Sequence, residues 1–176
     1  MDSAVALYLP LCELGWCARS GSAFTLTPAG RSRLAALLAA ERSLVDPSTV
    51  VALYEDFCVF DAELKQIMTA WQLKRPGVSN DHLDAAYDRE VLQRLADLHG
   101  RAAPVLARLA ALSTRLGGYA ERLGRAAARV AGGDRAYVAR IISDSYHTVW
   151  FELHEELIAL AGLTRDALAR EGRKSC

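Results

Sequence analysis

Residues 144–162 read Asp-Ser-Tyr-His-Thr-Val-Trp-Phe-Glu-Leu-His-Glu-Glu-Leu-Ile-Ala-Leu-Ala-Gly, and this stretch decides the fold. At the helical turn of about 100° per residue, its large apolar side chains gather on one broad arc and its carboxylates on the other. The apolar arc holds Tyr146, His147, Val149, Trp150, Phe151, Leu153, His154, Leu157 and Ile158. An arc this wide is typical of a central helix with neighbours on two sides. The sequence therefore predicts an all-α helical bundle built around this helix.

Composition limits what the chain can be. Its 176 residues suffice for one domain, or one domain with a small appendage. Lys and Arg number 21, as do Asp and Glu, so no overall field favours nucleic acid. The four cysteines lack zinc-site spacing and are interpreted as reduced thiols. Without a basic leader or an apolar run of about 18 residues, a cytoplasmic protein with no membrane partner is expected.

The chain is expected to divide into a mixed segment, 1–44, and a helical unit, 45–176. In the helical unit, Asp46-Pro47 begins a helix that runs to about Leu73, and a loop follows. Asn80 is expected to cap the next helix, which kinks or stops between Gly100 and Pro104. Further helices are predicted over 105–112, over 114–131, after Asp134, over 144–162 and from Thr164.

Residues 1–44 are predicted to form a helix interrupted by Pro10, a short hairpin over 15–27, and a second helix that Thr27-Pro28 opens. On the motifs Leu14-Gly15-Trp16 and Leu26-Thr27-Pro28-Ala29-Gly30-Arg31, this segment resembles the back half of a MarR-type winged helix. That resemblance implies DNA binding and transcriptional regulation. The stretch in the recognition position, 2–14, offers no Arg or Lys to phosphates or bases. A winged-helix remnant used for packing or dimerisation is the alternative.

A second resemblance covers most of the chain. Asn80-Asp81-His82, Ala85-Ala86-Tyr87-Asp88 and residues 144–155 are similar to actinobacterial proteins that join a winged helix to a helical region. Some of those proteins are associated with phosphoenolpyruvate-utilising, pyruvate phosphate dikinase-like proteins. The resemblance implies an architecture more than an activity, and relative to that pattern the N-terminus is expected to be truncated. No Gly-rich phosphate loop or phosphohistidine-type motif supports dikinase chemistry.

Two histidines on the central helix are the leading candidates for a site. His147 and His154 are seven residues apart, which separates them by about 10.5 Å along the axis. That spacing is too long for two ligands of one metal, so neither a metal nor a cofactor is expected. A groove that holds one organic molecule against both rings, with Trp150 between them, fits better. The alternative for each ring is a core imidazole hydrogen-bonded to a neighbour.

Three carboxylates are secondary candidates. Asp61 and Asp84 interrupt apolar stripes, and a desolvated carboxylate can act as a general base. An ion pair or a helix cap is the alternative for both. Glu155, at the edge of the central helix's apolar face, either assists a histidine or is a solvated carboxylate.

These candidates lead to one hypothesis, a small-molecule-binding protein on a regulator-derived scaffold. Its predicted pocket is formed by Trp71, Tyr87, Tyr146, His147, Trp150 and His154, with Asp61, Asn80, His82 and Glu155 as further contacts. A cofactor-free cyclisation, isomerisation or elimination would use His147 or His154 as acid or base, assisted by Asp84 or Asp61. The main alternative is a ligand-responsive winged-helix regulator, and a purely structural partner protein is a third. A small organic ligand is the expected partner, while a homodimer and DNA stay open.

Overall fold

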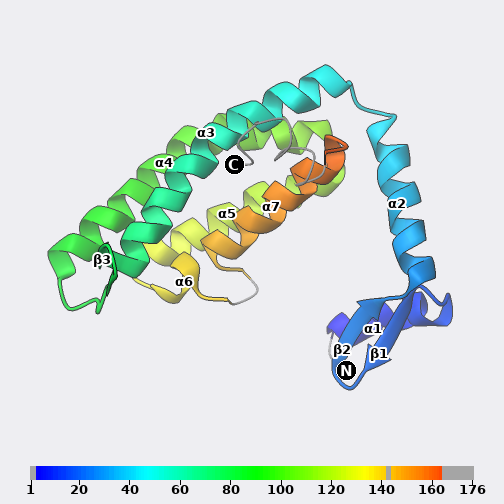
Figure 1. The fold of residues 1–176 in the computed structure, drawn as a ribbon, viewed down its shortest axis with the longest axis horizontal. Helices are drawn as coiled ribbons and strands as arrows, with labels where there is room; N and C mark the ends of the chain where they lie inside the picture. The colour runs from blue at the N-terminus through cyan, green and yellow to red at the C-terminus, as the bar shows by residue number, and fades with distance from the viewer. Residues whose placement is uncertain (1–2, 142–143, 164–176) are drawn as a thin grey trace. The chain divides into compact units, whose positions relative to one another are not determined.

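The computed structural model describes residues 3–141 and 144–163. The chain forms two compact units, Met1–Asp46 and Pro47–Cys176. Apart from two short antiparallel hairpins, the elements of the described residues are all helices (Figure 1). The predicted all-α fold with a small N-terminal hairpin is confirmed. No helix in these residues is both long and apolar enough to span a bilayer.

The N-terminal unit consists of α1 (Ser3–Glu13), β1 (Cys17–Ser20), β2 (Ala23–Leu26) and α2 (Pro28–Arg42). As predicted, Thr27 caps α2: its hydroxyl accepts a hydrogen bond from Gly30 N at 3.0 Å, with Pro28 at the first helical position. A Cβ on Gly30 would collide with the backbone carbonyl of Trp16, so the glycine allows α2 to approach the start of the hairpin. Pro10 lies inside α1, which continues through it.

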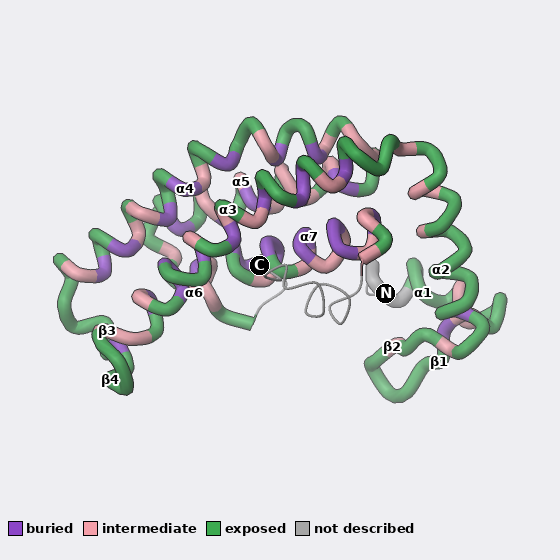
Figure 2. The backbone as a smooth tube through the Cα atoms, turned by 45° about the horizontal axis from the view of Figure 1, so that its top comes forward, coloured by how far each residue is buried: buried purple, intermediate pink, exposed green. Residues whose placement is uncertain are grey.

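The second unit is a four-helix bundle. Its long helices are α3 (Pro47–Gln72), α4 (Ala85–Leu112), α5 (Thr114–Ala131) and α7 (Tyr146–Leu160). Going around the bundle, α3 packs on α4, α4 on α5, α5 on α7, and α7 on α3. A hairpin of β3 (Leu73–Arg75) and β4 (Val78–Ser79) links α3 to α4, and α6 (Ala136–Ala139) lies between α5 and α7. Figure 2 shows that the buried positions of the four helices face one another.

Helix α7 has neighbours on two sides, α5 and α3, as predicted. Ser145 caps the helix, accepting a hydrogen bond from Thr148 N at 3.3 Å, and Gly162 follows its end at φ +68°. Its buried residues are Tyr146, Val149, Trp150, Leu153, His154, Leu157, Ile158 and Leu160. The predicted arc was too wide at one edge. His147 and Phe151 are exposed, because a pocket rather than a helix lies beside that edge.

Helix α4 departs most from the prediction, since it continues through Gly100 and Pro104 as far as Leu112. The proline removes one backbone hydrogen bond, at a cost of about 3 kcal/mol in a helix interior. Against that cost, a stripe of apolar side chains on both sides of Pro104 is buried. The stripe is Leu95, Leu98, Ala102, Leu106 and Leu109. Tertiary packing thus outweighs the local helix breaker.

The start of α4 also differs from the prediction. Asp84, not Asn80, caps it, and Leu83, just before the cap, is 84% exposed. The β3–β4 hairpin occupies most of the predicted loop. Cys12 and Cys17 are free thiols, but Cys58 is disulfide-bonded, so the expectation of four reduced cysteines is wrong there. The helix expected from Thr164 lies outside the described residues.

Candidate functional site

A pocket of about 290 Å³ lies between α3 and α7. It is lined by Asp61, Leu64, Lys65, Met68, Thr69, Gln72, His147, Trp150, Phe151 and His154. Four of the predicted site residues therefore meet in one place: Asp61, His147, Trp150 and His154. The α3 residues recur at helical spacing and face the exposed edge of α7, so the packing of these two helices creates the pocket.

Asp61 is the buried charge of this pocket, with 4% of its surface exposed. Its Oδ1 accepts a hydrogen bond from the Trp150 indole N–H at 3.0 Å. Among the residues that the structure describes, its Oδ2 has no hydrogen-bond partner; the Lys65 ammonium lies 2.9 Å away, as an ion pair outside hydrogen-bonding geometry. The Lys65 side chain is itself 58% exposed. Asp61 is therefore a desolvated carboxylate with one oxygen incompletely satisfied, which is costly for a buried charge.

His154 fits the core-imidazole alternative. It is 4% exposed, with Nδ1 4.0 Å from Asp61 Oδ1 and Nε2 3.5 Å from the Tyr54 hydroxyl. The Phe57 ring stacks on Trp150 at 4.6 Å between centroids and lies 5.7 Å from the His154 ring. Because both ring nitrogens face protein groups, His154 is placed to position Asp61 and Trp150 rather than to take a proton from a ligand.

His147 differs from His154 because it lies at the exposed edge of the pocket. Partial burial of the ring lowers the pKa of His147, while the negative charge of Asp61 opposes that shift. A lowered pKa keeps the imidazole neutral near pH 7, where it can accept a proton. The nearby Asp61 would stabilise the imidazolium that results. This pair can support general acid–base chemistry on a molecule in the pocket.

A second cluster surrounds Asp88, which is completely buried. Asn80 Nδ2 donates to Asp88 Oδ1 at 2.9 Å, and Arg135 Nη1 donates to Oδ2 at 2.8 Å. His82 Nδ1 lies 3.1 Å from both oxygens. Burial alone would raise the pKa of Asp88, but the hydrogen bonds from Asn80 and His82 and the charges of His82 and Arg135 lower it overall.

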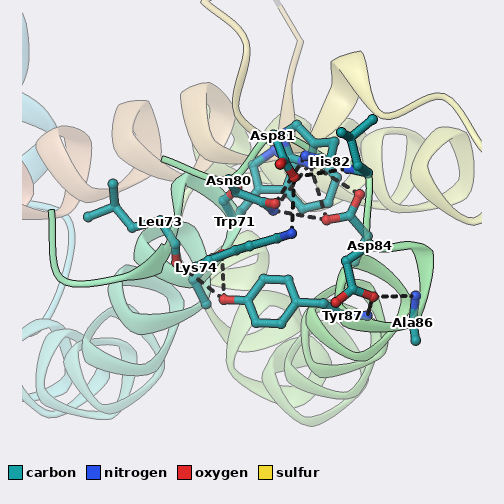
Figure 3. Close-up of polar contacts among 12 residues, drawn as sticks. Trp71, Leu73, Lys74, Asn80, Asp81, His82, Asp84, Ala86 and Tyr87 are labelled. Carbon is teal, nitrogen blue, oxygen red and sulfur yellow. Dashed lines mark hydrogen bonds and ion pairs between the residues drawn. The ribbon is translucent and has the colours of Figure 1, made fainter. Parts of the chain in front are cut away.

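Figure 3 shows how this cluster is attached to α3, with Asn80 and His82 beside the Trp71 ring. The His82 ring lies 4.4 Å from the Trp71 ring, and Asn80 Nδ2 donates to the Trp71 carbonyl at 3.1 Å. The Asn80 Oδ1 accepts from His82 N, which holds His82 at φ +58°. The expectation that Asn80 is a helix cap at a loop mouth is therefore wrong. Its amide joins the end of α3 to α4.

Three more predicted residues lie outside the pocket between α3 and α7. Asp84 is exposed, and its Oδ1 accepts hydrogen bonds from two backbone N–H groups of the first turn of α4, so the capping alternative fits it. The Tyr87 hydroxyl donates to the carbonyls of Ala70 and Leu73, at 2.9 and 3.2 Å. Glu155 is half-buried on α7 and does not line the pocket.

Tyr146 is fully buried in the bundle rather than in the pocket. Its hydroxyl lies 3.2 Å from Nδ1 of His99, on α4, and burial raises its pKa. A buried phenol that stays protonated is a hydrogen-bond donor, so Tyr146 has a structural partner in His99. The predicted set thus separates into the pocket of Asp61, His147, Trp150 and His154 and residues that hold the bundle together.

Four residues of these two clusters were not among the predicted site residues: Asp88, Arg135, Lys65 and Tyr54. A signal for Asp88 was present, because residues 88, 91, 95, 98 and 102 follow the alternating three- and four-residue spacing of one helix face. Asp88 therefore begins the buried stripe of α4. No comparable signal exists for Arg135, which reaches Asp88 from the start of α6 across 47 residues.

Comparison with known proteins adds no further assignment: no protein-family model, curated protein or solved structure matches this chain. Within the described residues, no three His, Cys, Asp or Glu side chains are grouped as metal ligands would be.

Proposed function

We propose that this chain binds a small organic molecule in the pocket between α3 and α7, and that His147 exchanges a proton with it. The observation that supports the proposal is the buried Asp61 carboxylate, which lines the pocket and whose Oδ2 pairs with the Lys65 ammonium but has no hydrogen bond among the described residues. Native proteins rarely leave a buried charge in this condition, and functional sites are the usual exception. A ligand that donates a hydrogen bond to Asp61 Oδ2 would supply the hydrogen bond that this oxygen lacks.

The ligand's chemistry follows from the pocket lining. A volume of about 290 Å³ is at the small end of the range for ligand sites. The apolar wall of Leu64, Met68 and Phe151 suits a compact hydrocarbon or aromatic body. The Asp61 carboxylate would bind a hydroxyl or ammonium group of the ligand, and this group would displace the exposed Lys65 ammonium from Oδ2. The expected ligand is a compact molecule with one such donor group.

The proposed chemistry is a proton transfer without a cofactor, as in a cyclisation, isomerisation or elimination. His147, neutral because burial lowers its pKa, takes a proton from the bound molecule. Asp61 then stabilises the imidazolium, and the same proton can return to another atom of the ligand. Trp150 holds Asp61 Oδ1, and Tyr54 faces Nε2 of His154. This division makes His147 the catalytic residue and Trp150 and His154 positioning residues.

Native mass spectrometry of the protein purified from the organism that encodes it tests the binding. Asp61→Asn keeps the acceptor for Trp150 but places an amide N–H where Oδ2 met the ligand. We expect a retained small molecule on the wild-type protein and at least a tenfold lower occupancy on this variant. Asp56→Asn, at an exposed position of α3, is the matched control and should retain the adduct. Equal occupancy of the retained molecule on Asp61→Asn and Asp56→Asn would contradict the proposed binding site.

The proton-transfer step has a separate test once the retained molecule is identified. His147→Ala should leave its binding within a few fold, because Asp61 holds it, but should abolish its conversion. His147 is exposed, so the variant is expected to fold normally. A variant that still converts the molecule at the wild-type rate would limit the function to binding.

A ligand-responsive DNA regulator is the second candidate, and the formation of the predicted hairpin and of the Thr27-capped α2 favours it. Arg19, Arg31 and Arg33 are exposed on this unit, although the described part of α1 carries no basic residue. A gel-shift series against the neighbouring promoter tests it. Salt-sensitive nanomolar binding that an Arg19→Ala change weakens would support the regulator, and the absence of such binding would exclude it.

A further inference from the structure

A second and larger cavity lies away from the proposed site. It is a groove of about 850 Å³ between α4 and α5. Its lining residues recur at helical spacing on both helices, including Ala85, Arg89, Leu92, Ala96 and His99 on α4. Gly124, Ala127, Ala128 and Ala131 line the α5 side, and their small side chains leave the space open. None of the proposed proton-transfer residues takes part.

One end of the groove is cationic. Arg89 is exposed on α4, and no ion pair joins it to another described residue. Arg135 lies at the same cavity, and Asp88 takes one of its five N–H donors. The remaining guanidinium donors are available to an anion. A carboxylate suits such a pair, because its two oxygens accept several charge-assisted hydrogen bonds.

His99 supplies a polar group farther along α4. Burial lowers its pKa, so the ring is neutral at pH 7. The Tyr146 hydroxyl has His99 Nδ1 as its hydrogen-bond partner within the described residues. When the phenol donates its proton to Nδ1, the neutral ring carries its own N–H on Nε2. His99 therefore contributes a neutral polar side chain to the lining of the groove.

The separation of these groups defines the shape of an occupant. Arg89 and His99 are ten residues apart on one helix, or about 15 Å along its axis. Between them the walls are mostly alanine and leucine. A volume of about 850 Å³ is within the range of sites that enclose a whole organic ligand.

We infer that this groove binds an elongated amphipathic carboxylate, with its head group on Arg89 and Arg135 and its apolar body along the alanine-rich walls towards His99. Charge complementarity selects an anion over a cation at the arginine end. The length of the apolar section selects a chain or flat ring system over a compact acid. The inference is independent of the function proposed for the pocket between α3 and α7.

Calorimetric titration of the full chain with decanoate tests this site, below the concentration at which decanoate forms micelles. We expect one decanoate per chain, and at least a hundredfold weaker binding of decyltrimethylammonium, which has a chain of the same length and the opposite charge. Arg89→Gln should weaken decanoate binding by about 10- to 100-fold, the loss of one or two charge-assisted hydrogen bonds. Arg94→Gln, on the same helix but outside the groove, should leave it unchanged.

A steric variant separates the groove from nonspecific attraction to arginine. A Cβ on Gly124 meets no atom within 4 Å, so Gly124→Leu fits the backbone and fills the groove. Gly118→Leu is its control, since Gly118 is equally unobstructed on the same helix and does not line the groove. We expect Gly124→Leu to abolish decanoate binding and Gly118→Leu to keep it. Wild-type binding in Gly124→Leu, no binding to the wild-type protein, or a dimer that only Gly124→Leu dissociates would each overturn the inference.

Discussion

Two buried carboxylates differ in how completely their hydrogen bonds are satisfied. Asp88 is bound by Asn80, His82 and Arg135, whereas Asp61 Oδ2 has, within the described part of the chain, an ion pair with Lys65 but no hydrogen bond. A fully satisfied buried charge acts as a structural anchor, and a partly satisfied one is a candidate for ligand binding. This contrast is the reason we propose a structural role for Asp88 and a ligand-binding role for Asp61.

Replacement of Asp88 should destabilise the bundle. In Asp88→Asn the charge is lost and an amide N–H faces the donors of Asn80 or Arg135, so we expect the free energy of unfolding to fall by about 3 kcal/mol. Urea denaturation at pH 7 measures the change. Asp97→Asn, at an exposed position of the same helix, should change stability by less than about 0.5 kcal/mol. Equal effects of the two changes would contradict the anchor role.

The pH dependence of stability provides a second test of Asp88. Because the pKa of Asp88 is lowered in the fold, its charged form stabilises the protein above the unfolded value of 3.8. That contribution is lost as pH falls below this value and through the folded pKa. Denaturation curves between pH 5 and 2 should therefore show a loss of stability in the wild-type protein that is smaller in Asp88→Asn. Parallel curves would show that Asp88 does not titrate as inferred.

His147 should titrate below its ordinary value of 6.5, because burial disfavours its charged form. The Asp61→Asn change removes the negative charge that opposes this shift, so the pKa of His147 should fall further. The ring-proton NMR signals of His147, followed from pH 8 to pH 4 in both proteins, measure the two midpoints. An unchanged or higher midpoint in Asp61→Asn would show that the two groups do not interact.

At the scale of elements, local signals predicted the fold wherever packing agreed with them. Thr27-Pro28 and Asp46-Pro47 marked the starts of α2 and α3, and the apolar arc of 144–162 marked α7. The extent of α4 could not be predicted, because Pro104 is a strong local helix breaker and the opposing term comes from distant side chains. The role of Asn80 was missed for a similar reason: its partners Trp71 and Asp88 come from two different helices.

A proline-to-alanine pair tests that explanation of α4. Pro104→Ala restores a backbone N–H to the interior of the helix, and we expect it to raise the free energy of unfolding by about 1–3 kcal/mol. Pro47→Ala is the contrast, because Pro47 begins α3, where no intrahelical partner for its N–H exists. That change should be close to neutral in the same urea titration. A neutral Pro104→Ala would mean that the helix has already adapted to its proline.

At the scale of the molecule, the core belongs to the second unit. Within residues 6–46, only Cys17 and Gly30 are buried, whereas the facing sides of α3, α4, α5 and α7 are buried along their length. A chain of residues 47–176 should therefore unfold cooperatively within about 3 °C of the full-length protein, a difference below about 1 kcal/mol. Thermal melts followed by circular dichroism measure this. A much lower midpoint would show that the first 46 residues stabilise the bundle.

The candidate site was partly predictable from sequence for the same physical reason. His147, Trp150 and His154 share one helix, so their spacing was enough to group them. Asp61 joins them only because α3 packs against α7, and no local pattern specifies which residues of two helices will meet. Tyr54 depends on that same packing, whereas Lys65 lies four residues after Asp61 on the same helix, a spacing that can be read from the sequence.

The three tryptophans of the chain can report directly whether the pocket beside Asp61 binds a ligand. Trp150 donates its indole N–H to Asp61, Trp71 lies beside His82, and Trp16 is in the N-terminal unit. Their indole signals in a nitrogen–proton NMR spectrum can be followed while compact amines and alcohols are added. We expect saturable shifts of the Trp150 signal alone, and no such shifts in Asp61→Asn. Shifts confined to Trp71 or Trp16, or none with any compound, would contradict the proposed binding site.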